Sequence, residues 1–220
     1  MQALSRLRSI QRIQKYHRGT FEEQAIQRRW RTVRMDLAFH PLTLKRWKDL
    51  EKLFGEDSIC RSCWCMWWRL SSSEWKKGRG RDRKDALKTI VSQGRVQGIL
   101  AYFDGQPIGW CSISPREEFR RLEGSRTLKR LDNRPVWSVV CFFVAKPFRG
   151  KGVSTKLLEA AVKYAGEEGA KMIEGYPNRS SEKQHDSTVY TGLASMFQKV
   201  GFTDHGSTSK TRTIMRYGLE

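Results

Sequence analysis

The order of apolar and polar residues predicts a mixed α/β domain that begins at Met35. Trp47, Leu50 and Phe54 recur at helical spacing and predict a helix over Leu44–Phe54, with Thr43 as its N-cap. Asp104-Gly105 between two apolar runs predicts a β-hairpin, because this dipeptide suits a type I′ turn. The predicted strands are Asp36–Pro41, Val96–Phe103, Ile108–Ile113, Val136–Val144, Lys171–Tyr176 and Thr211–Tyr217. Further helices are expected over Asp85–Ser92, after Ser154 and over Tyr190–Val200, and polar loops over Ser71–Arg83, Pro115–Arg134 and Pro177–Asp186.

The most informative stretch is Val136–Ala165, where an apolar strand leads through a glycine-containing turn into an amphipathic helix. The turn is Arg149-Gly150-Lys151-Gly152-Val153-Ser154. The first N–H groups of a helix have no acceptor within the helix and the helix dipole is positive there, so this end suits a phosphate. Glycine allows close approach of a ligand, and Arg149 and Lys151 add positive charge. The segment therefore predicts a cradle for a nucleotide or coenzyme pyrophosphate.

This turn resembles the acyl-CoA-binding motif of the GNAT (GCN5-related) N-acetyltransferases, with Ser154 at the position where Gly or Ala is usual. The order of predicted elements over Met35–Tyr217 is also similar to the GNAT order. Cys63-Trp64-Cys65-Met66 is similar to a segment of mostly uncharacterised bacterial and archaeal members. The resemblance implies an α/β (α+β) fold with a mixed, mostly antiparallel central sheet flanked by helices. Splayed central strands would form the slot for acyl-CoA.

The resemblance also implies which residues hold the coenzyme. Arg149, Gly150, Lys151, Gly152, Val153 and Ser154 would hold the pyrophosphate. The backbone of the central strand from Phe142 to Val144 would bind the pantetheine arm as an additional strand does.

The last helix departs from the family pattern of Asn, Ala and Tyr followed by Gly-Phe. Gly201-Phe202 sets the register, which places Phe197 at the Tyr position and Tyr190 at the Asn position. Phenylalanine has no proton to give, so the usual general acid is missing. Tyr190 is a candidate for contacting the pantetheine arm or for catalysis, and a packing role for its ring is the alternative.

Glu174 is the second catalytic candidate, because it lies on a strand beside the expected slot and could accept a proton directly or through water. The alternative is that Glu174 faces solvent or pairs with a basic neighbour. The predicted strand Val136–Val144 contains no carboxylate, so one common position for a base is empty.

The segment Cys60–Arg69 contains three cysteines and three tryptophans. Its C-x2-C-x-C spacing supplies three metal ligands, one fewer than a structural zinc site needs, so no metal is expected. In GNAT proteins the region between the first strand and the hairpin usually shapes the acceptor site. Trp64, Trp67 and Arg69 are therefore candidates for an acceptor pocket that takes an aromatic, cationic or carboxylate-bearing amine. Packing in the core is the alternative.

Residues 1–34 form a basic N-terminal extension, with nine basic and two acidic residues, in a chain of 220 residues and net charge +19. Leu4, Leu7, Ile10 and Ile13 indicate a short amphipathic helix in this segment, which is otherwise expected to be partly disordered. A targeting segment and a start-site artefact are alternatives. The extension and a second basic block, Lys76–Lys88, would attract polyanions without sequence preference.

The composition indicates in which cellular compartment the protein is expected. Five cysteines without a secretory signal favour a reducing, cytoplasmic location, and no apolar run is long enough to span a membrane. The expected function is transfer of an acetyl group from acetyl-CoA, as co-substrate, to a primary amine of a small molecule or a protein, by a monomer or homodimer. A nucleic-acid-associated basic protein and an acyl-CoA-binding sensor with little catalysis are the alternatives.

Overall fold

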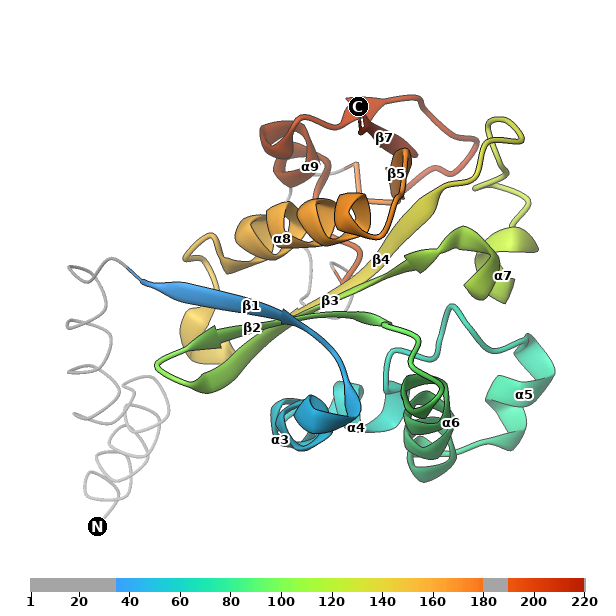
Figure 1. Cartoon of the computed structure of the whole chain (residues 1–220). Helices are drawn as coiled ribbons and strands as arrows, with labels where there is room; N and C mark the ends of the chain where they lie inside the picture. Colours follow the sequence, from blue (N-terminus) through green and yellow to red (C-terminus); the bar gives the residue numbers. More distant parts are fainter. Residues whose placement is uncertain (1–34, 180–189, 220) are drawn as a thin grey trace, which may run out of the picture. The chain divides into compact units, whose positions relative to one another are not determined.

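A seven-stranded sheet runs through the structure, a computed structural model that describes residues 35–179 and 190–219 (Figure 1). The chain divides into two units, Met1–Asp36 and Leu37–Glu220, and every element below belongs to the second. The strands are β1 (Leu37–Pro41), β2 (Gly98–Phe103), β3 (Gln106–Pro115), β4 (Trp137–Val144), β5 (Met172–Gly175), β6 (Thr203–Asp204) and β7 (Met215–Gly218). Their order in the sheet is β1-β2-β3-β4-β5-β7-β6, and β4–β5 is the one parallel pair recorded for these strands. This mixed, mostly antiparallel sheet confirms the predicted fold class.

Helices cover both faces of the sheet (Figure 1). They are α3 (Trp47–Gly55), α4 (Ser58–Cys63), α5 (Ser72–Lys77), α6 (Gly80–Ser92), α7 (Arg120–Glu123), α8 (Val153–Glu167) and α9 (Ala194–Val200). On β3, Gly109 lies under Leu157 of α8, whereas the next residue, Trp110, packs with residues of α3. Since successive strand residues point to opposite faces, α8 and α3 lie on opposite sides of the sheet. Within the described residues, no helix has the length and apolar character needed to cross a membrane.

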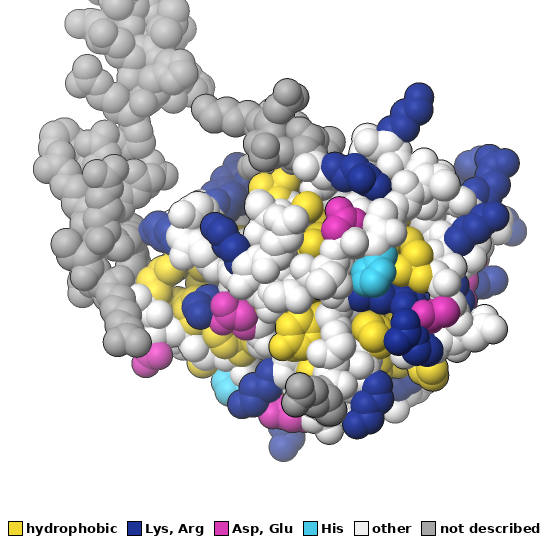
Figure 2. Space-filling model, turned by 90° about the horizontal axis from the view of Figure 1, so that it is seen from above, with side chains coloured by type: hydrophobic (Ala, Val, Ile, Leu, Met, Phe, Trp, Pro, Cys, Tyr) yellow, Lys and Arg dark blue, Asp and Glu magenta, His cyan; other side chains and the backbone are white. Residues whose placement is uncertain are grey.

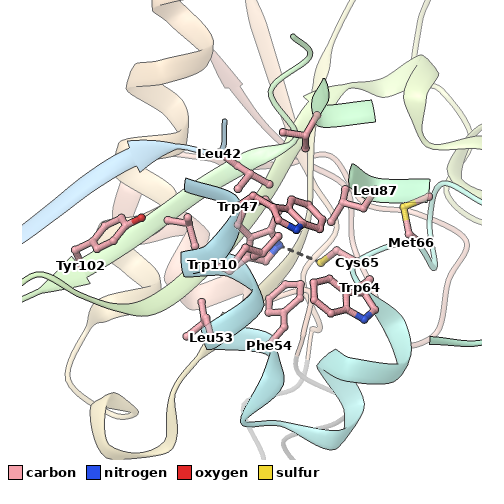
Figure 3. Packing of buried hydrophobic residues seen from close by; sticks show 13 residues of the cluster. Leu42, Trp47, Leu53, Phe54, Trp64, Cys65, Met66, Leu87, Tyr102 and Trp110 are labelled. Atoms are coloured by element: carbon pink, nitrogen blue, oxygen red, sulfur yellow. Dashed lines mark hydrogen bonds between the residues drawn. The ribbon is translucent and has the colours of Figure 1, made fainter. Parts of the chain in front are cut away.

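A core rich in tryptophan fills the α3 side of the sheet (Figure 3). Trp64 stacks on Trp47 with ring centroids 5.9 Å apart, and Phe54 meets both Trp64 and Trp110 edge to face. The Trp110 Nε1–H donates to Cys65 Sγ at 3.1 Å, which gives the buried indole its hydrogen-bond partner. This core anchors the cysteine-containing segment against β3.

The predicted hairpin is confirmed as β2 and β3. Asp104 and Gly105 have φ values of 48° and 68°, so both central residues adopt the left-handed conformation that a type I′ turn requires.

Two segments between β1 and β2 differ from their predictions. The predicted helix begins with a short 3-10 helix, Leu44–Arg46, that continues into α3; Thr43 is its N-cap residue, as predicted, but the Thr43 side chain makes no capping hydrogen bond. The predicted loop Ser71–Arg83 contains α5 and the start of α6. Ser71 and Glu74 form a capping box at α5, a local signal that the polar composition of this stretch concealed.

The elements at the C-terminal end are shorter than predicted. Helix α9 begins at Ala194 and not at Tyr190, because Gly192 is left-handed (φ 82°) and Leu193 is extended. The last strand, β7, covers only the end of the predicted Thr211–Tyr217. Most of the predicted loop Pro177–Asp186 lies outside the described residues, as do residues 1–34 with their predicted helix.

Candidate functional site

Strands β4 and β5 separate after three paired residues. The parallel register joins Trp137–Val139 to β5 and ends there, so the remainder of β4 has no strand partner on that side. On its other side, Ser112 pairs with Cys141 and Ile113 with Val139, which leaves Val140 as an extra residue in a β-bulge. The predicted splay of the central strands is therefore present, and the bulge lies where it opens.

The glycine turn follows the free end of β4 and leads into α8. Gly150 and Gly152 are exposed, with φ of 72° and 78°, and a Cβ built on either would meet nothing within 4 Å. The Lys156 N–H donates to the Gly152 carbonyl at 3.1 Å, so the N–H groups of Val153–Thr155 have no acceptor within the helix. Left-handed residues within a turn are typical of backbone arrangements that bind anions through their N–H groups, and here Gly150 and Gly152 are left-handed. The turn thus presents open backbone donors at the positive end of a 15-residue helix.

Basic side chains tie this turn to β4. The Arg149 Nε–H donates to the Val144 carbonyl at 2.8 Å, and its guanidinium lies 5.9 Å from the Phe143 ring centroid. The Lys151 Nζ lies 5.7 Å from the Phe148 ring centroid. Both cations remain beside the turn and add to its positive potential.

The backbone predicted to hold a pantetheine arm already has protein partners. The Phe142 N–H donates to the Tyr190 carbonyl at 2.6 Å, and the Val144 carbonyl accepts from Arg149. The segment before α9 therefore lies along the unpaired edge of β4. Phe142 itself is buried, and its ring meets Phe197 at 6.1 Å.

Phe197 is a core residue. It is fully buried, packs edge to face on Phe202, and lies so close to Gly175 that a Cβ there would collide with its ring. The position where the family commonly has tyrosine thus carries no proton donor.

Tyr190 lies in the turn before α9. Its hydroxyl accepts a hydrogen bond from Arg212 Nη2 at 3.0 Å, while its carbonyl accepts from β4. Burial raises the pKa of this hydroxyl above its ordinary value of 10.0, and the Arg212 charge opposes the shift. A tyrosine in this state stays protonated at neutral pH beside the open edge of β4.

Glu174 is buried in an ionic network on β5. Its Oε2 accepts from Arg116 Nη1 at 2.8 Å and from the Tyr176 hydroxyl at 2.7 Å, and its Oε1 accepts from Arg216 Nε at 2.8 Å. Arg116 and Arg216 also pair with Glu123 and Asp132, respectively. Burial and the Glu174 carboxylate raise the pKa of Tyr176 well above its ordinary value. With both oxygens engaged and 1% of the residue exposed, Glu174 is placed as a structural ion-pair partner, the alternative weighed from the sequence.

The structure does not gather Trp64, Trp67 and Arg69 into a pocket. Trp64 belongs to the core described above. Arg69 is buried, donates to Glu118 at 2.9 Å and to Ser114 Oγ at 2.8 Å, and so is held inside the protein. Trp67 is 36% exposed and lies against Trp75, with Arg121 stacked 4.0 Å from its ring centroid.

The cysteines of this segment are all free thiols, and Cys65 is buried while Cys60 and Cys63 are partly buried. In the parts of the chain that the structure describes, no three His, Cys, Asp or Glu side chains group together so as to hold a metal ion. His40 packs edge to face on Tyr102, and His185 lies outside the described residues.

Sequence reasoning missed Trp68 and Arg212 as a pair. They lie far apart in the chain, outside its helices and strands, and the Arg212 guanidinium lies 5.5 Å from the ring centroids of both Trp68 and Tyr190. Arg212 is one of two arginines in the predicted strand Thr211–Tyr217, and nothing in the sequence indicates this contact.

Comparison with known proteins agrees with the fold. The profile of the Acetyltransferase (GNAT) family matches residues 64–185, more than half of the chain, and the chain belongs to this family. A curated relative, an uncharacterized N-acetyltransferase from Archaeoglobus fulgidus, is 26% identical over 103 residues. That match covers 47% of this chain and 63% of the relative, which is less than two thirds of its length.

Solved structures share the fold at low sequence identity. A GNAT-family acetyltransferase from Listeria monocytogenes matches with a TM-score of 0.53 and 13% identity, over 85% of this chain and 99% of that one. An uncharacterized protein from Bacillus halodurans matches with a TM-score of 0.52 and 15% identity, over 83% of each chain. At these identities the likeness concerns the fold.

Proposed function

We propose that this protein is an acetyl-CoA-dependent N-acetyltransferase that acts on a primary amine of a small molecule or a protein. The observation that carries the proposal is the junction of the open β4 edge with the glycine turn. The turn offers donors for a pyrophosphate, and the part of β4 beyond Val139 has no strand partner on the β5 side, where a thioester arm would lie. Membership of the GNAT family supports the same reaction class.

Different residues would hold the pyrophosphate and the pantetheine arm of acetyl-CoA. Backbone N–H groups from Gly150 to Ser154 would hold the pyrophosphate, with Arg149 and Lys151 supplying charge. The arm would run beside Val144, because the Phe142 N–H is occupied by Tyr190. The proposed contact of the pantetheine arm is therefore nearer to the glycine turn than the Phe142 end of the predicted segment Phe142–Val144.

Proton transfer is proposed to use Tyr190. In the reaction an amine attacks the thioester carbonyl, and the thiolate that leaves must gain a proton. The Tyr190 hydroxyl accepts its hydrogen bond from Arg212, so its own proton remains available to a leaving group. Glu174 is committed to two arginines, so we propose that the amine arrives neutral and that water accepts the proton its nitrogen loses after attack.

An acyl-CoA-binding sensor is the second candidate, and the buried Phe197 favours it, because the usual proton donor is missing there. The structure gives less support to polyanion binding by the block Lys76–Lys88, because two of its basic side chains are engaged within the protein. Arg83 is buried against Trp75, with its guanidinium 3.5 Å from the ring centroid, and Lys84 pairs with Glu51 at 2.8 Å. Figure 2 shows Lys and Arg side chains spread over one face, with Asp and Glu among them.

Release of CoA thiol from acetyl-CoA, measured against a panel of primary amines, tests the proposal. An amine-dependent rate above the background of hydrolysis is expected. Binding of CoA in a thermal-shift assay without turnover on any amine would favour the sensor.

A further inference from the structure

Arg212 carries a charge that has no acidic partner among the described residues. Its backbone is fixed: the carbonyl accepts from Arg179 Nε at 3.0 Å and from Ser207 Oγ at 2.7 Å. Its Nη2 donates to Tyr190, and its Nε is buried without a hydrogen-bond partner. A partly buried guanidinium in this state gains from binding an anion, since charges taken from water are costly unless paired.

Trp68 adds a second unpaired donor at the same place. Its side chain is in the cluster of Trp68, Phe119, Leu122, Leu128, Val140, Tyr176 and Ile214, against which Cys141 and Tyr190 pack. Trp68 is only 6% exposed, yet its Nε1–H has no partner in the described part of the structure. The rings of Trp68 and Tyr190 flank the Arg212 guanidinium, each at 5.5 Å. Buried donors are normally satisfied, so an unpartnered N–H on a guanidinium and another on the ring that it contacts favour an acceptor supplied by a ligand.

This cluster lies on the face of the sheet opposite α8. On β4, Trp137 meets Tyr164 of α8 at 6.1 Å, whereas Ser138 Oγ is 2.9 Å from the hydroxyl of Tyr176 in the cluster. Adjacent strand residues point to opposite faces, so the Trp68 cluster and α8 are separated by the sheet. An anion at Arg212 would therefore be distinct from the pyrophosphate at the start of α8. It would lie one tyrosine side chain away from the open edge of β4.

We infer that Arg212 and Trp68 bind a carboxylate on the acceptor, so that the substrate is an amine that also carries a carboxylate, such as an amino acid. The inference rests on the proposed acetyl transfer. A carboxylate has two oxygens in one plane, and in this proposal one accepts from Arg212 Nε and the other from Trp68 Nε1. Arg212 keeps its bond to Tyr190 through Nη2, so one guanidinium holds the acceptor and positions the proposed proton donor.

Matched acceptors test the inference: α-amino acids and their carboxamides, which differ only in the charged group. We expect kcat/KM to favour the carboxylate form by about ten- to a hundredfold, the range for one charge-assisted interaction. In Arg212→Gln the ratio should fall to near one, even if loss of the Tyr190 contact slows both forms. Lys163→Gln, which removes a charge that is 79% exposed on α8, should keep the wild-type ratio. Equal rates for both forms in the wild type, or an unchanged ratio in Arg212→Gln, would overturn the inference.

A binding measurement separates this inference from the proposed reaction. Full-length protein loaded with CoA is titrated with an N-acetyl amino acid and with its carboxamide. The site is supported if the wild type binds the N-acetyl amino acid but not its carboxamide, if Arg212→Gln loses this binding, and if Trp68→Phe weakens it several-fold. This support holds even if no amine is acetylated. Absence of acetylation would refute only the proposed acetyl transfer. If Arg212→Gln does not fold, Trp68→Phe provides the same comparison. Failure of the wild type to distinguish the two ligands contradicts the site.

Discussion

Replacement of Glu174 by glutamine separates a structural role from a catalytic one. The carboxylate accepts hydrogen bonds from Arg116, Tyr176 and Arg216, and a glutamine would direct an NH₂ group at one of the guanidinium groups. Removing one partner of a buried ion pair typically costs about 3–5 kcal/mol. Arg116 keeps Glu123 and Arg216 keeps Asp132, so we expect the lower end, about 3 kcal/mol.

Urea and thermal unfolding, followed by tryptophan fluorescence, measure this cost. For a chain of this length, about 3 kcal/mol lowers Tm by about 6–12 °C. Glu159→Gln is the matched control, because Glu159 forms an exposed pair with Lys156 and should change stability by less than about 1 kcal/mol. Unchanged stability of Glu174→Gln together with lost turnover would refute the structural assignment and restore Glu174 as a base.

Three other predictions concern the proton donor, the thiols and the extension. Tyr190→Phe should lower kcat at least about tenfold with little change in CoA affinity, as expected for loss of a general acid; wild-type kinetics would reduce Tyr190 to packing. Burial and the neighbouring Cys65 raise the pKa of Cys63 to about 11. Iodoacetamide should therefore modify Cys63 at pH 8 at least about tenfold slower than a free thiol, as peptide mapping would detect; a free-thiol rate contradicts this. Deletion of residues 1–34 should leave cooperative unfolding of the unit Leu37–Glu220 intact and shorten retention on heparin, and loss of the cooperative transition would show that the boundary is wrong.

Local signals in the sequence account for the parts of the fold that were predicted correctly. Asp104-Gly105 specifies its turn through backbone preference alone, and the glycines before α8 mark a strand–turn–helix unit within about 30 residues. Such features depend on neighbours in the chain, so periodicity and turn chemistry are sufficient to find them.

Features that depend on distant partners could not be predicted. Glu174 is fixed by Arg116 and Arg216, 58 and 42 residues away, and no pattern on β5 announces either arginine. The apolar spacing of Tyr190–Val200 is helical throughout, so the sequence predicts that the helix starts at Tyr190. In the structure, the left-handed Gly192 delays the start of α9 to Ala194. Family spacing identified Tyr190 as a position of interest, but its contact with Arg212 required the folded chain.

Calorimetric titration of CoA into the full-length protein tests the central claim most directly. Gly152→Val is compared with Gly169→Val, a glycine beyond the other end of α8 with φ +84° and open space at its Cβ. Both substitutions impose similar backbone strain, and about 22 Å of helix separates the two ends. We predict that the wild type and Gly169→Val bind CoA with equal affinity and that Gly152→Val loses at least about tenfold, because its side chain would block the approach of the pyrophosphate to the backbone. Absence of binding heat in the wild type, or wild-type affinity in Gly152→Val, would contradict the assignment of this turn as the coenzyme site.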